Sequence, residues 1–244
     1  MTKSSGLGDY FLVDGYDLSG DIGALSSIHG GPAALAVTGI NKLGVERVGG
    51  ERDAAIEFQA WFNDATAQAH PVLSALPTTD RYASYLHGQA LGNPMASCLG
   101  LQIDYGLDRA GDGALTVASS VQSDGYGLEW GIQATPGLRA DTTATNGSSI
   151  DNTAATNFGL QAYLHVSAFT GTSVTVKLQD SADNSSWSDV TGGAFTAATA
   201  RGAQRIATAN NLTVRRYLRV ATSGTFSAAT FVVQVVRNET TVAF

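Results

Sequence analysis

Four histidines are the residues of this sequence best suited to metal binding or acid–base chemistry, and their spacing supports neither. His29, His70, His87 and His165 lie far apart along the chain, and none follows another at the i, i+4 spacing of a helical metal site. A zinc centre needs three or four converging donors. The pattern therefore predicts scattered polar or turn histidines, with no metal and no cofactor.

The cysteine and the carboxylates also predict no catalysis. Cys98 lies among small residues without the motif of a nucleophile, so we expect it to fill space in the core. Acidic residues gather at 14–21 and 51–53, but acid–base catalysis needs a pair set across a cleft. The acidic segment 180–189 lacks the spacing and final glutamate of an EF-hand, which favours a hairpin turn at Asp183-Asn184 over a calcium loop. We expect the chain not to be an enzyme.

The composition predicts a protein with few charged residues and no groove for nucleic-acid phosphate. Of 244 residues, 43% are hydrophobic and 14% charged, and the formal net charge is −7. Negative charge argues against a nucleic-acid-binding groove. A low charged fraction indicates a surface that is either uncharged and polar or covered by partners. No run approaches a membrane span, and the N-terminus lacks the apolar core of a signal peptide. We expect synthesis and assembly in a cytoplasm, without membrane contact.

Alternating apolar and polar residues predict an all-β chain with one short helix. Strands are expected at 10–13, 54–62, 81–86, 99–105, 115–122 and 127–133, and in the second half at 160–166, 174–178, 216–221 and 230–237. The helix is expected at 71–77, with Pro71 at its first position and Pro77 ending it. The glycine-rich segment 19–50 is expected to be a long functional loop.

A polar segment and a change of charge predict two domains. Residues 1–136 contain six Lys/Arg and fifteen Asp/Glu, whereas 137–244 contain eight and six. The segment 137–157 has no apolar periodicity and is expected to be a linker. We therefore expect a core domain at 1–136 and a β-sandwich at 158–244.

Three strands of the first block share a surface with no Lys or Arg. Its expected members are Glu57, Gln59, Gln102, Asp104, Thr116, Ser120 and Gln122. Such a surface is either an ordinary solvated sheet face or a wall along which a polyanion slides without sticking, because each Lys/Arg–phosphate contact strengthens binding.

Several segments resemble the major tail protein of long-tailed bacteriophages, particularly those of actinobacterial hosts. The resemblance covers nearly the whole chain. It is carried by segments 13–23, 37–40, 46–52, 69–77, 125–131, 158–163 and 190–195, whose sequences are VDGYDLSGDIG, VTGI, ERVGGER, AHPVLSALP, GYGLEWG, FGLQAY and VTGGAF.

The resemblance implies a tail-tube β-sandwich or barrel with one short helix, followed by an immunoglobulin-like or carbohydrate-binding-like sandwich on the outside of the tube. Six copies would form a ring around a channel for genomic DNA, and rings would stack in the virion tail beside tape measure, terminator and tip proteins. The loop 19–50 would reach a neighbouring subunit, with inter-subunit contacts at Asp21, Glu46, Arg47 and Arg52. The predicted function is a structural tail-tube subunit.

Two other function classes compete with this one. A phage decoration or receptor-binding protein would grip host glycan through an aromatic platform, for which Tyr163, Trp187 and Tyr217 are the candidates. Trp187 is equally suited to packing in a hairpin. A glycoside hydrolase is the third class, but no motif places its carboxylate pair.

Overall fold

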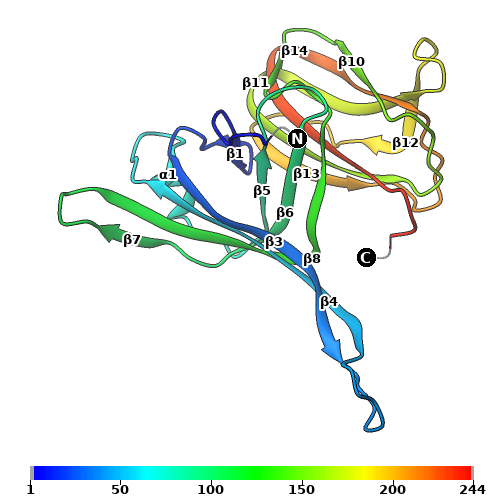
Figure 1. The fold of residues 1–244 in the computed structure, drawn as a ribbon. Coiled ribbons are helices and arrows are strands. Elements are labelled where there is room, and N and C mark those ends of the chain that lie inside the picture. The colour runs from blue at the N-terminus through cyan, green and yellow to red at the C-terminus, as the bar shows by residue number, and fades with distance from the viewer. Residues whose placement is uncertain (1–2, 243–244) are drawn as a thin grey trace. The chain divides into compact units, whose positions relative to one another are not determined.

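The computed structural model describes residues 3–242, which form antiparallel β-strands and one short helix (Figure 1). The all-β class is confirmed. The N-terminal half contains β1 (Tyr10–Val13), β2 (Tyr16–Asp17), β3 (Ile22–Ala36), β4 (Arg47–Trp61), α1 (Ala69–Leu73), β5 (Arg81–Leu86), β6 (Pro94–Gln102), β7 (Gly106–Arg109) and β8 (Leu115–Gln133). The C-terminal half contains β9 (Arg139–Asp141), β10 (Asn146–Asp151), β11 (Leu160–Ser181), β12 (Ser188–Ala194), β13 (Gly202–Ala207) and β14 (Tyr217–Arg237). Within residues 3–242 no helix has the length and apolar character of a membrane span.

The chain folds into two compact units that do not follow the expected boundary. The first unit comprises the residues up to Gly20, Tyr82–Ser97 and the residues from Trp130 onward. The second comprises Asp21–Arg81 and Cys98–Glu129. Strands β6 and β8 contribute residues to both units. The charge follows this division, since the second unit contains five Lys/Arg and twelve Asp/Glu, a net charge of −7, and the first contains nine of each.

The segment 137–157 is not the expected linker, because it contains β9 and β10, which both pair with β14. Asp141, at the end of β9, forms a buried salt bridge of 2.6 Å with Arg139 and accepts a hydrogen bond from Thr222 Oγ1. The sequence pattern missed these strands because an edge strand gains its backbone hydrogen bonds without needing alternating apolar residues.

The C-terminal part of the first unit is a β-sandwich built on two long strands. β11 and β14 pair from Leu160↔Arg237 to Ser181↔Tyr217, with register shifts around the middle of both strands. One half of the pair carries β13 and β9, and the other carries β12 and β10. Bulges let a strand bend from one sheet into the next, and side chains from both halves form one buried apolar cluster. Four expected strands are therefore two, each bent in the middle.

A buried histidine ties the N-terminal strands to β11. His165 is fully buried and accepts a hydrogen bond at Nδ1 from the backbone N–H of Gly15. Its Nε2 lies 2.8 Å from Ser84 Oγ, which bonds Ser97 Oγ in turn. β1 pairs with β2 and β5 beside this network. This network gives both nitrogens of the buried imidazole a hydrogen-bond partner, and without such partners the imidazole would destabilise the core.

The second unit is built on an antiparallel sheet in the order β3–β4–β8–β7. Ile56, Phe58 and Ala60 are buried on one side of β4, while Glu57 and Gln59 are exposed on the other, as the alternation predicted. β3 and β4 form one long hairpin, so the expected loop 19–50 is mostly strand and only 37–46 connects the two strands. Most of the glycines that suggested a loop, from Gly23 to Gly49, lie in exposed parts of this hairpin.

The helix begins two residues earlier than expected and ends at Leu73, so Pro71 is its third residue. A proline is tolerated there because the first N–H groups of a helix have no partner within the helix. Asp21 satisfies one of them, since its Oδ2 accepts a hydrogen bond from Ala69 N at 2.9 Å. Val72 and Leu73 anchor the helix through their buried side chains.

Candidate functional site

The register of β4 and β8 gathers polar side chains on one face of the sheet in the second unit. Glu57 lies opposite Ser120, and Trp61 lies opposite Thr116. We call this surface the polar face, and it comprises Glu57, Gln59, Trp61, Thr116, Ala118, Ser120 and Gln122. Its members include one carboxylate and no Lys or Arg. Gln59 Nε2 donates to Thr116 Oγ1 at 3.5 Å, a weak cross-strand contact.

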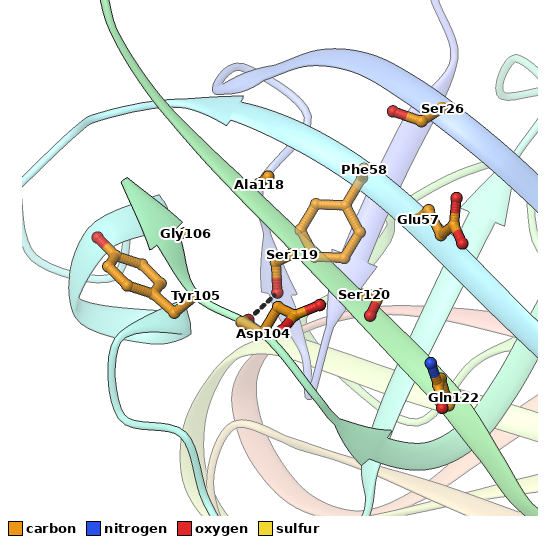
Figure 2. Close-up of a pocket in the computed structure, with 10 residues that line it drawn as sticks. All are labelled: Ser26, Glu57, Phe58, Asp104, Tyr105, Gly106, Ala118, Ser119, Ser120 and Gln122. Atoms are coloured by element: carbon orange, nitrogen blue, oxygen red, sulfur yellow. Dashed lines mark hydrogen bonds between the residues drawn. The ribbon is translucent and has the colours of Figure 1, made fainter. Parts of the chain in front are cut away.

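A shallow groove of about 450 Å³ crosses the polar face (Figure 2). Four of the predicted channel-lining residues line it, namely Glu57, Asp104, Ser120 and Gln122. Figure 2 shows Ser119 Oγ donating to the backbone oxygen of Asp104, a bond of 2.8 Å that holds the segment after β6 against β8. The groove contains two carboxylates and no basic side chain among its lining residues, so a phosphate polymer meets no cation there.

Gln102 is not part of this surface, contrary to the prediction. It is buried, and its Nε2 donates to the backbone oxygens of Leu73 and Asp104 at 2.8 and 3.0 Å. Its Oε1 accepts a hydrogen bond from Arg81. The alternation assigned the wrong face at this point, because the apolar residues Leu101 and Ile103 are exposed and Gln102 between them points inward to its hydrogen-bond partners.

The outer part of the β3–β4 hairpin extends past its neighbour β8, and we call residues 30–50 the arm (Figure 1). β4 pairs with β8 only from Ala55 to Trp61. Exposed apolar side chains gather on the arm, namely Leu35, Val37, Ile40, Leu43, Val45 and Val48. Ile40 and Leu43 are as exposed as in an extended peptide. Apolar residues grouped in this way are typical of surfaces that associate with another protein.

The residues predicted to contact neighbouring subunits divide into two groups. Asp21 is buried and is used within its own chain, where Asn63 Nδ2 donates to its Oδ1 at 2.8 Å, so it is not available for such a contact. Glu46 and Arg47 are exposed on the arm, and Arg52 is exposed on β4 just outside it. Glu46 forms an exposed salt bridge of 3.1 Å with Lys42.

The three aromatic residues expected to form a glycan platform do not form one. Tyr163 is completely buried and packs edge-on against Tyr82. Trp187 and Tyr217 are partly exposed, but an arginine guanidinium lies over each ring, at 4.3 Å and 4.9 Å from the ring centroid. Arg219 is on β14 and distant in sequence from Trp187, so the sequence could not show that contact, whereas Arg216 directly precedes Tyr217.

The chemically versatile side chains are held in structural roles. Burial, with smaller contributions from Asp53 and Glu129, raises the pKa of the Cys98 thiol to about 12, which keeps it protonated and unreactive. Asp183 caps the turn after β11 by accepting from the N–H groups of Ser185 and Ser186. These hydrogen bonds lower its pKa. Within residues 3–242 no three His, Cys, Asp or Glu side chains are grouped to hold a metal ion.

Comparison with known proteins gives low-scoring structural matches only. No family model and no curated protein matches the sequence. The Dit protein of phage SPP1, described as a paradigm of the hub adsorption apparatus of phages that infect Gram-positive bacteria, matches with a TM-score of 0.35 and 11% identity over 94% of this chain and 99% of that chain. Two structures of the phage p2 baseplate in its activated conformation, one with strontium and one with calcium, match with TM-scores of 0.30 and 0.29 and identities of 9% and 10%, over 96% of this chain and 99% of theirs.

Proposed function

We propose that the chain is a structural subunit of a bacteriophage tail, which assembles with copies of itself into rings that stack around a channel for DNA. The family is supported by the sequence resemblance to major tail proteins. The observation that carries the proposal is the sheet of the second unit, which combines a face without basic side chains and strand edges without partners.

The two outer edges of this sheet are open. Among the described residues, β3 pairs only with β4, and β7 pairs only with β8. An open edge presents unpaired N–H and C=O groups, and closure of a ring removes such edges. Pairing of β3 in one copy with β7 in the next would continue the sheet around a ring, and the polar face would then line the channel.

The distribution of charge supports the same arrangement. The second unit carries the net charge of the whole chain, −7. Its polar face nevertheless carries few charges. The carboxylate there repels DNA weakly, and the face has no cation to which DNA phosphates could bind. The arm supplies an apolar surface for contact between copies, in place of the loop expected there. The resemblance to major tail proteins implies six copies in each ring.

Electron microscopy of the purified full chain at high concentration, with and without a tail-tip initiator, tests the proposal. We expect rings that stack into tubes. A protein that stays monomeric under both conditions would contradict self-assembly. Rings that never stack would contradict the proposed tube and would indicate a subunit that forms a single ring in the tail.

A further inference from the structure

The outer face of the β12–β11–β14–β10 sheet holds an arginine whose charge is not neutralised. On this sheet and directly before β14, Lys177, Arg215 and Arg216 each form a salt bridge with a carboxylate. Arg219 on β14 forms none among the described residues. The register explains this difference, because Arg219 lies opposite Gln179 on β11 and Ser149 on β10, which are both uncharged.

Arg219 is held in a fixed position by its neighbours. Its Nε and Nη2 both donate to Gln179 Oε1, at 2.9 and 2.8 Å. Gln179 is itself fixed, since its Nε2 donates to Asp189 Oδ1 at 2.7 Å. The guanidinium lies over the ring of Trp187 at 4.3 Å, and this cation–π contact adds to its rigidity. Burial lowers the pKa of Arg219, in contrast to Arg215 and Arg216, whose carboxylate partners raise theirs.

The two bonds to Gln179 use one edge of the guanidinium and leave another edge free. An arginine has five N–H donors, and the side of the fork formed by Nε and Nη2 is occupied. The end formed by Nη1 and Nη2 has no acceptor among the described residues. This end has the spacing that binds the two oxygens of a carboxylate or phosphate. Because the side chain is already ordered, binding there costs little further entropy.

We propose that Arg219 and Trp187 form a binding site for the carboxylate or phosphate groups of an anionic polysaccharide. The guanidinium lies over the Trp187 ring, which nevertheless stays partly exposed, and the exposed part of the ring is next to the cation, where a sugar carrying an acidic group can contact it. The face is an open sheet surface and not a deep cavity, which favours an extended polymer over a small molecule. This site is separate from the polar face and does not depend on the proposed tube.

Binding of the full chain to immobilised polysaccharides tests the site. Alginate presents carboxylates, phosphomannan presents phosphodiesters and dextran presents neither, so the first two distinguish the source of the oxyanion. We expect binding to one or both anionic polymers that weakens as salt is raised, and none to dextran. Arg219→Gln should weaken binding about tenfold or more, the usual effect of losing a charge-assisted bidentate contact.

Two further variants separate this site from general charge attraction. Arg219→Lys keeps the charge and loses the fork, so it should bind nearly as weakly as Arg219→Gln. Arg216→Gln is the matched control, because Arg216 is already paired with Asp151 at 2.6 Å, and it should bind like the unchanged protein. The proposal is overturned if neither anionic polymer binds, if Arg219→Lys binds fully, if Arg216→Gln loses as much, or if poly-glutamate binds as well as the polysaccharides.

Discussion

The backbone N–H of Gly15 donates a hydrogen bond of 3.1 Å to Nδ1 of His165, across a sequence separation of 150 residues. Nδ1 must therefore be unprotonated in the folded state, and the ring must be neutral. Burial lowers the pKa of His165 from 6.5 to about 4, and the nearby carboxylate of Asp14 opposes this shift only in part.

The first prediction is a loss of stability in acid that depends on His165. The unfolded chain binds a proton at His165 below about pH 6.5, whereas the folded chain does so only near pH 4. The free energy of unfolding should therefore fall as the pH drops from 6.5 to 4, by about 3 kcal/mol from this residue. Urea unfolding at pH 7 and pH 4 measures the change. His165→Gln should be less stable at pH 7 but should lack this part of the pH dependence. An equal pH dependence in both proteins would contradict the prediction.

The second prediction concerns Gly15, where the chain needs a residue without a side chain. Its φ is +81°, and a Cβ there would lie 2.4 Å from the backbone oxygen of Val166 and 2.7 Å from that of Gly202. Gly15→Ala should lower the free energy of unfolding by about 3 kcal/mol, since it combines an unfavourable φ with a backbone clash. Gly20→Ala is the control, because Gly20 has no neighbour within 4 Å and no positive φ. Thermal unfolding of both variants measures the difference, and equal losses would refute the argument.

The third prediction separates assembly from folding at the arm. Ile40 and Leu43 are fully exposed, so Ile40→Lys with Leu43→Lys should change the free energy of unfolding by less than about 0.5 kcal/mol. The same double variant should reduce ring or tube formation strongly, because it places charge in an apolar contact between copies. Sedimentation velocity and electron microscopy measure assembly. Replacing Lys3, which is exposed and outside the arm, by Glu should leave assembly intact. Normal assembly of the double variant would remove the arm from the contact.

The fourth prediction concerns the polar face as a surface that does not bind DNA. Gln59→Lys with Gln122→Lys adds two exposed cations to this face, and each new phosphate contact strengthens binding at low salt. Assembled tubes of the variant should retain double-stranded DNA, whereas unchanged tubes should not. Ala182→Lys adds the same kind of charge in the turn after β11, in the other unit, and should leave DNA binding unchanged. A gel-shift assay over a range of salt concentrations measures this. Equal retention by the control would show that position on the polar face is irrelevant.

Local patterns predicted several of the strands that have one buried face. The alternation around Ile56 and Phe58 defined β4, and the alternation in 160–166 defined the first part of β11, because a half-buried strand must repeat every two residues. Turn residues were also predictable. Asn184 has a φ of +60°, which asparagine tolerates, and it lies in the hairpin turn expected there.

Positions that depend on partners distant in sequence were not predictable. The sequence did not show that β9 and β10 pair with β14, that Gln102 turns inward to Arg81, or that Tyr163 is buried beneath its neighbours. These outcomes depend on strand register and on contacts between segments far apart in the chain, which no local pattern contains.

The sequence by itself determined the all-β class, the low fraction of charged residues and the absence of Lys and Arg among the residues of the polar face, because these follow from composition and period. Only the tertiary structure decided three features: the two units that are each made of separate stretches of the sequence, the arm formed from glycine-rich strands, and the free edge of the Arg219 guanidinium. Each of these arises from which strand lies beside which, and strand pairing is a property of the folded chain as a whole.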